Sequence, residues 1–70
     1  MKIKVYQSAE DEYKEMEVLG RYKYIGKTDS IGCINGKIYY CMGIEDDELR
    51  IVDETKEDYL YKKELFKEEK

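Results

Sequence analysis

The feature that most constrains this fold is a series of short apolar and aromatic runs in the C-terminal half, separated by polar turns. The runs are "KIYYCMGIE" (37–45), "LRIVD" (49–53) and "DYLY" (58–61), and each has the length and composition of a strand. The segments "DDE" and "ETKE" separate them. Several short strands joined by tight turns predict a small, mostly β barrel or sandwich.

Elements on either side of these runs extend the pattern. "RYKYIG" (21–26) reads as a strand, and a Gly-, Asp- and Asn-rich loop follows it and ends in the turn pair Asn35-Gly36. After the third run, "KKEL" predicts one helical or 3₁₀ turn, and "FKEE" predicts a last short strand. Tyr39, Tyr61, Leu65 and Phe66 are then expected to point mainly into the core.

The N-terminal residues allow two interpretations. "KIKVYQ" alternates in polarity and predicts a half-buried strand. In "SAEDEYKEMEVLG", a capping box at Ser8 and Asp11 and a stop at Gly20 favour a short helix. The helical stripe would be Ala9, Tyr13, Met16 and Leu19. The alternative is a hairpin whose returning strand lies in "KEMEVLGRYKYIG". A boundary near Gly20 would divide the chain into an N-terminal strand-plus-helix appendage, 1–20, and a strand-rich unit, 21–70.

The order of elements from residue 21 onward resembles that of a bacterial SH3-like barrel. In that fold a strand, a long irregular loop, a three-strand meander, a 3₁₀ turn and a closing strand follow one another. The stretch "NGKIYYCMGIEDDELRIVDETKEDYLYKKELF" also resembles small proteins of Gram-positive bacteria whose function is uncharacterised. The resemblance implies a five-stranded SH3-like barrel over 21–70 but implies little about function, because this fold hosts many unrelated roles.

The peptide-binding members of this fold hold proline-rich segments in an aromatic groove. Their groove uses an ALYDY-like segment, a tryptophan at the start of the third strand, and a proline in the 3₁₀ turn. In this chain "RYKYIGKTD" stands in place of the ALYDY-like segment. Glu48 and Leu49 stand in place of the tryptophan, and Lys62 and Lys63 stand in place of the proline. The resemblance therefore does not extend to proline-rich peptide binding, and it assigns no site residues.

Charge and cysteine content exclude several classes of function. The net charge is −4, which disfavours nucleic acid and anionic membranes as partners, because phosphate contacts require Lys and Arg. The interleaved charges of the N-terminus and the lack of a long apolar run predict a cytoplasmic protein. In that compartment Cys33 and Cys41 are expected to be free thiols in or near the core. Their spacing fits no metal site, and we expect no metal or other cofactor.

Two motifs resemble parts of a phosphate-binding loop and a calcium-binding loop, but the spacing of their residues fits neither. Gly26-Lys27-Thr28 resembles the end of a phosphate-binding loop, but the position where the first glycine belongs is Arg21. The acidic run 45–48 has neither the ligand spacing nor the glycine of a calcium loop, so a solvated hairpin turn is favoured. Histidine is absent and no base stands beside either cysteine. We expect no catalytic residues and no enzyme activity.

A non-enzymatic protein-interaction or regulatory module with an unidentified protein partner is therefore the favoured function. Eight tyrosines and an acidic shell supply a candidate interaction surface: Tyr22, Tyr40, Tyr59, Asp46 and Asp47. The edge of "KIKVYQ" could also pair with another chain, giving a homodimer or strand addition to a partner. The alternative function is an acidic decoy or inhibitor that blocks a basic, nucleic-acid-binding surface.

Overall fold

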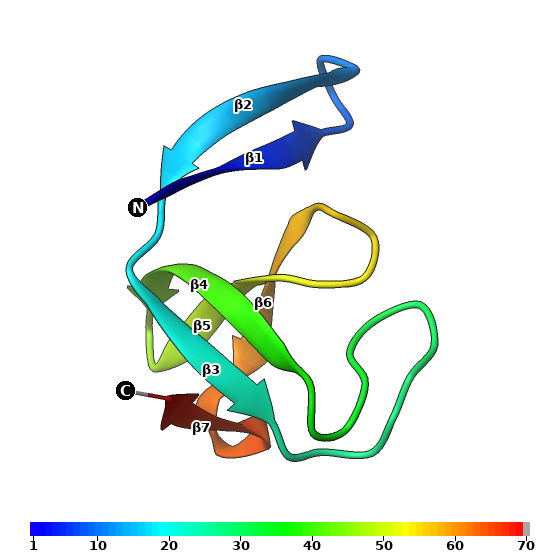
Figure 1. Cartoon of the computed structure of the whole chain (residues 1–70), viewed down its shortest axis with the longest axis vertical. Helices are drawn as coiled ribbons and strands as arrows, with labels where there is room; N and C mark the ends of the chain where they lie inside the picture. The colour runs from blue at the N-terminus through cyan, green and yellow to red at the C-terminus, as the bar shows by residue number, and fades with distance from the viewer. Residues whose placement is uncertain (70) are drawn as a thin grey trace.

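The computed structural model describes residues 1–69 and contains two antiparallel sheets (Figure 1). A hairpin is formed by β1 (Lys2–Gln7) and β2 (Glu12–Glu17). A five-stranded sheet has the order β6-β5-β4-β3-β7. Its members are β3 (Gly20–Tyr24), β4 (Ile38–Glu45), β5 (Glu48–Val52), β6 (Asp58–Lys62) and β7 (Phe66–Glu69), with the 3₁₀ turn η1 (Lys63–Leu65) before β7. The prediction of a mostly β chain is confirmed.

The strands expected from residue 21 onward form where the sequence places them. A long loop follows β3, and β4, β5 and β6 make an antiparallel meander. The chain returns through η1, and β7 pairs with β3. The register of β4 shifts between Cys41 and Gly43, and such a bulge bends a strand. Among the described residues β6 and β7 pair only with β5 and β3, so the sheet is open between them.

The helix predicted in residues 8–19 is wrong, and a hairpin forms instead, although its returning strand is Glu12–Glu17 and not the whole of 14–26. Ser8 and Asp11, read as a capping box, lie instead in the loop that joins β1 to β2. The Asp11 N–H donates to the Ser8 carbonyl at 3.3 Å, and Asp11 has a φ of 50°. Tyr13 packs its ring against that of Tyr6, with the centroids 5.2 Å apart. An isolated helix this short is marginal, whereas pairing gives β1 a hydrogen-bonded neighbour.

The main hydrophobic core packs against one face of the five-stranded sheet. Its buried members are Tyr24, Cys33, Tyr39, Cys41, Leu49, Ile51 and Phe66, and Tyr22, Tyr61 and Leu65 pack against them partly buried. The phenyl ring of Phe66 lies 5.3 Å from the Tyr24 ring and 5.7 Å from the Tyr61 ring. The core positions predicted for Tyr39 and Phe66 are confirmed, and both cysteines are buried free thiols.

The tight turns follow the polar segments. Asp46 and Asp47 form a two-residue turn between β4 and β5, and both have positive φ, 48° and 67°. Positive φ at both central residues is the type I′ geometry that matches the twist of a hairpin. The solvated turn predicted there is confirmed. Gly36, with a φ of 86°, makes the turn that leads the long loop into β4.

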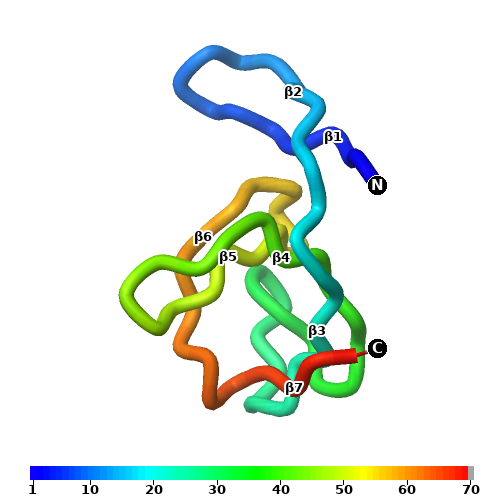
Figure 2. Tube along the Cα trace, turned by 90° about the vertical axis from the view of Figure 1, so that its left-hand side faces the viewer, coloured from blue at the N-terminus to red at the C-terminus, as the bar shows by residue number. Residues whose placement is uncertain are grey.

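The hairpin lies beside the turn between β5 and β6, at the end of the molecule opposite β7 (Figures 1 and 2). The Tyr6 N–H donates to the Lys56 carbonyl at 2.9 Å, and the Leu19 N–H donates to the Cys41 carbonyl at 2.8 Å. Val5 is fully buried, although it is not part of the main core cluster. The first hydrogen bond places one edge of β1 next to the β5–β6 turn, and the second joins the linker between β2 and β3 to β4.

Candidate functional site

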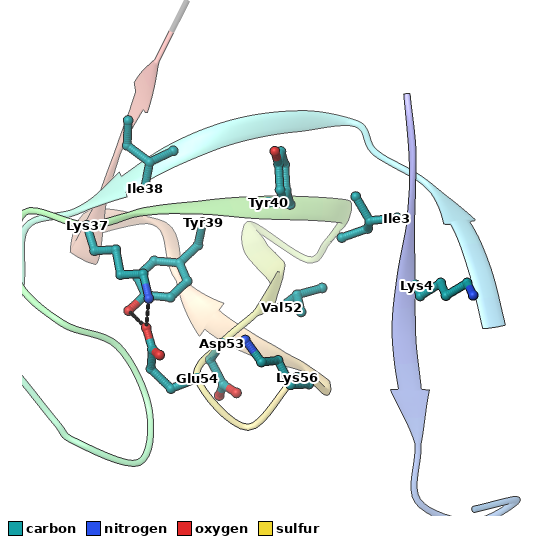
Figure 3. A pocket seen from close by; sticks show the side chains of 10 residues that line it. All are labelled: Ile3, Lys4, Lys37, Ile38, Tyr39, Tyr40, Val52, Asp53, Glu54 and Lys56. Carbon is teal, nitrogen blue, oxygen red and sulfur yellow. Dashed lines mark hydrogen bonds and ion pairs between the residues drawn. The ribbon is translucent and has the colours of Figure 1, made fainter. Parts of the chain in front are cut away.

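A groove of about 220 Å³ lies between the hairpin and the five-stranded sheet (Figure 3). Its apolar lining comes from both walls: Ile3 of β1 lies on the hairpin side, and Ile38 and Tyr40 of β4 and Val52 of β5 lie on the sheet side. Along β4, Ile38 and Tyr40 alternate with Tyr39 and Cys41, which face the core. Ile38 and Tyr40 therefore point to the opposite side of the sheet. The outer face of the meander is therefore apolar where β1 passes it.

The polar lining of the groove is held by hydrogen bonds within the chain. The Glu54 carboxylate accepts from the Lys37 ammonium at 2.6 Å and from the Tyr39 hydroxyl at 2.5 Å. The Tyr39 hydroxyl in turn accepts from the Ile34 N–H at 2.8 Å. The bonds from Lys37 and Tyr39 hold the pKa of the Glu54 carboxyl below its usual value. Burial and the bond to Glu54 raise the pKa of the Tyr39 hydroxyl far above its usual value.

Asp53, which also lines the groove, is a buried carboxylate with two structural roles. One oxygen accepts from the Tyr61 hydroxyl at 2.6 Å. The other accepts from the N–H of Thr55 at 2.9 Å and from its hydroxyl at 2.5 Å. These bonds fix the β5–β6 turn and connect it to β6. Asp53 and Glu54 are therefore engaged by neighbouring donors, and neither presents a free base to the groove.

Cys33 lies close to this hydrogen-bond network, but its thiol is buried and unreactive at neutral pH. Its side chain is 1% exposed, and burial raises the pKa of the thiol from 9.0 to about 11, although the nearby Tyr61 hydroxyl opposes the shift. Burial also raises the pKa of the Cys41 thiol. Because the thiolate is the reactive form, both cysteines are poor nucleophiles at neutral pH.

Lys4 and Lys56 border the groove at the hairpin. Lys56 occupies the left-handed region with a φ of 74°, and its carbonyl receives the hydrogen bond from Tyr6. Ile3 points toward Tyr40 and Val52, whereas the side chain of Lys4 points away from them (Figure 3). Lys4 therefore lines the groove with its backbone rather than its ammonium group.

The five residues predicted as an interaction surface are not brought together. Tyr40 lines the groove, whereas Tyr22 pairs with Tyr39 and packs against the core on the other face. Tyr59 is exposed on β6 and donates to the Glu57 carboxylate at 3.0 Å. Asp46 and Asp47 precede β5, while the groove lies at the far end of β5 beside Val52.

Sequence reasoning missed the groove residues from β1 and from the β5–β6 turn. Ile3 and Val52 lie far apart in the sequence, and the helix interpretation gave Ile3 no defined neighbour. The hairpin alternative contained the available signal, because a two-stranded hairpin needs an apolar face to pack against. Ile3 and Val5 form that face.

No group of three or more Cys, Asp or Glu side chains in residues 1–69 could hold a metal ion. Nor does this part of the chain contain a helix with the length and apolar character that crossing a membrane requires. Comparisons of this chain with protein families, with curated proteins and with solved structures find no match.

Proposed function

We propose that the five-stranded sheet is an SH3-like barrel and that the chain is a non-enzymatic protein-interaction or regulatory module of a bacterial cytoplasm. The element order supports this fold: a strand, a long loop, a three-strand meander, a 3₁₀ turn and a last strand that pairs with the first. The N-terminal hairpin is then an addition to the barrel, and it forms one side of the groove.

The observation that carries the functional proposal is the mixed character of the groove. Ile3, Tyr40 and Val52 remain partly exposed, and Ile38 is 42% exposed, so an apolar surface is open to a partner. Its polar groups are held by hydrogen bonds within the chain. An apolar centre with a polar rim is the usual anatomy of a protein interface. Rigid, occupied carboxylates suit binding better than proton transfer.

Alanine variants test this proposal directly. Tagged protein is used to capture partners from an extract of the source cell, and Tyr40→Ala is compared with wild type. Tyr59→Ala is the matched control, because it removes a half-exposed tyrosine that is not part of the groove. We expect a partner that wild type and Tyr59→Ala retain and Tyr40→Ala loses. Equal capture by all three proteins contradicts the proposal.

The acidic-decoy alternative depends on another surface. The Asp47 side chain is 89% exposed, and Asp46 beside it in the β4–β5 turn is also exposed. A decoy's binding should fall steeply between low and moderate salt and should be abolished by the double change Asp46→Lys and Asp47→Lys. Binding in the groove should survive that double change and fail with Tyr40→Ala.

A further inference from the structure

The outer edge of β1 presents backbone groups toward the groove. The Val18 N–H donates to the Met1 carbonyl at 2.8 Å and continues the ladder between β1 and β2. Hydrogen-bonded pairs alternate in an antiparallel ladder, so Ile3 and Val5 also bond to β2. The N–H and carbonyl groups of Lys2, Lys4 and Tyr6 must then point the other way.

Only part of this edge is occupied. The Tyr6 N–H donates to the Lys56 carbonyl, which makes a first contact of the kind that a neighbouring strand would make. Among the described residues, the N–H groups of Lys2 and Lys4 have no comparable backbone partner. Because Lys4 lines the groove with its backbone, the unoccupied stretch of the edge opens into it.

We propose that this stretch of β1 binds one extended segment of a partner protein by strand addition, and that the segment alternates acidic and aliphatic residues. Backbone hydrogen bonds to Lys2 and Lys4 would provide affinity, and alternate side chains would provide specificity. This inference rests on the proposed function, because it names the partner chemistry of the same groove.

Charge favours acidic residues on one face of that segment. The side chain of Lys4 points away from the groove (Figure 3), and Lys2, two residues earlier on β1 and also exposed, lies on the same face. Across the paired edge of β1, Lys2 stands opposite Glu17 and Lys4 opposite Glu15 of β2. Acidic side chains on the incoming strand would lie directly across from both lysines, where opposite charges attract and like charges repel.

The other face of the segment would enter the groove. Residues that alternate with the acidic ones would point toward Ile3, Tyr40 and Val52. At about 30 Å³ per water molecule, the 220 Å³ groove has the volume of roughly seven waters, which suits one or two aliphatic side chains.

Other occupants of the edge are less suitable. A second copy of β1 would place Lys2 or Lys4 opposite another lysine, because Tyr6 is already engaged. The groove is lined by no residue of β2, so a strand added at the free edge of β2 would not place side chains in it.

The probe is an acetyl-Glu-Val-Glu-Val-Glu-amide peptide, titrated into the full chain. We expect saturable binding, chemical-shift changes at Lys2, Ile3 and Lys4, and slower exchange of the Lys4 amide. Lys4→Glu should weaken binding about tenfold and should instead favour a Lys-Val-Lys-Val-Lys peptide. Lys67→Glu has the same change of charge on an exposed position of β7 and should bind like wild type.

A second peptide separates strand addition from simple attraction of charges. The same acidic peptide, N-methylated at alternate residues, keeps its charge but cannot form the backbone ladder. Equal binding of both peptides overturns the inference, as does equal weakening by Lys4→Glu and Lys67→Glu. Self-association through β1 without peptide would identify a second copy as the occupant and would also overturn it.

The inference and the proposed function can fail separately. If the acidic peptide does not bind but Tyr40→Ala still loses a cellular partner, the groove is an interface and strand addition is wrong. If Tyr40→Ala loses no partner and the peptide does not bind, both are wrong.

Discussion

Seven buried side chains form one core in the five-stranded sheet, whereas the hairpin of β1 and β2 buries a single residue, Val5. Every residue of β2 except Met16 is exposed. A two-stranded hairpin alone is marginally stable at best. The sheet therefore stabilises itself, and the hairpin depends on docking against it. The difference shows how a small domain can gain a groove: an added element of low stability forms one wall, and the outer face of a stable sheet forms the other.

Removing a core ring should have the largest effect. Phe66→Ala deletes a side chain that is 7% exposed and contacts the rings of Tyr24 and Tyr61. We expect the free energy of unfolding to fall by about 3–5 kcal/mol in urea denaturation. Lys63→Ala is the control. It removes an exposed ion pair with Asp47 and should change stability little. A large loss from Lys63→Ala would contradict the placement of η1.

Removing the hairpin's buried side chain should have a smaller and local effect. Val5→Ala deletes two methyl groups, which corresponds to about 1.5 kcal/mol of burial. Hydrogen exchange should become faster in β1 and β2 and stay unchanged in β4 and β5. Leu19→Ala, at a position 60% exposed, should leave both regions unchanged. Faster exchange throughout the chain after Val5→Ala would show that the two regions unfold as one unit.

Alkaline pH should lower the stability of the five-stranded sheet, because it deprotonates a buried thiol and two tyrosine hydroxyls of the core. The pKa of Cys33 is raised from 9.0 to about 11, so the folded state retains a proton that the unfolded state releases. Its contribution to stability is complete below pH 9.0 and is lost as the pH rises through about 11. Burial raises the pKa of Tyr39 and Tyr61 in the same direction. Denaturation midpoints should fall across this window, and a constant midpoint would contradict the burial of these groups.

The smallest expected effect is a gain in stability from a substitution in the β4–β5 turn. Asp47 has a φ of 67°, and the left-handed conformation costs a non-glycine residue about 1–2 kcal/mol. Glycine adopts it freely but loses more entropy on folding, by roughly 0.5–1 kcal/mol. Asp47→Gly should therefore stabilise the chain by roughly 0.5–1 kcal/mol in thermal or urea unfolding. A loss of stability would show that the Asp47 side chain contributes more than an exposed ion pair with Lys63 should.

The sequence predicted the sheet much better than the site. Short apolar runs with polar turns between them determine β4, β5 and β6, because each run pairs with the next along the chain. The prediction for residues 8–19 was wrong, because Ser8, Asp11 and the apolar spacing fit a capped helix as well as a hairpin. The groove could not be predicted, since it depends on where the hairpin docks. Of the predicted surface residues, Tyr40 alone lines it.

The exchange rate of one amide tests the docked hairpin most directly. The Tyr6 N–H lies on the outer edge of β1, where only the Lys56 carbonyl, 2.9 Å away, protects it. In the free protein we expect the Tyr6 amide to exchange much more slowly than the Lys4 amide on the same edge. Equal, rapid exchange at Tyr6 and Lys4 would show that the hairpin does not dock, and the groove would then lack one of its walls.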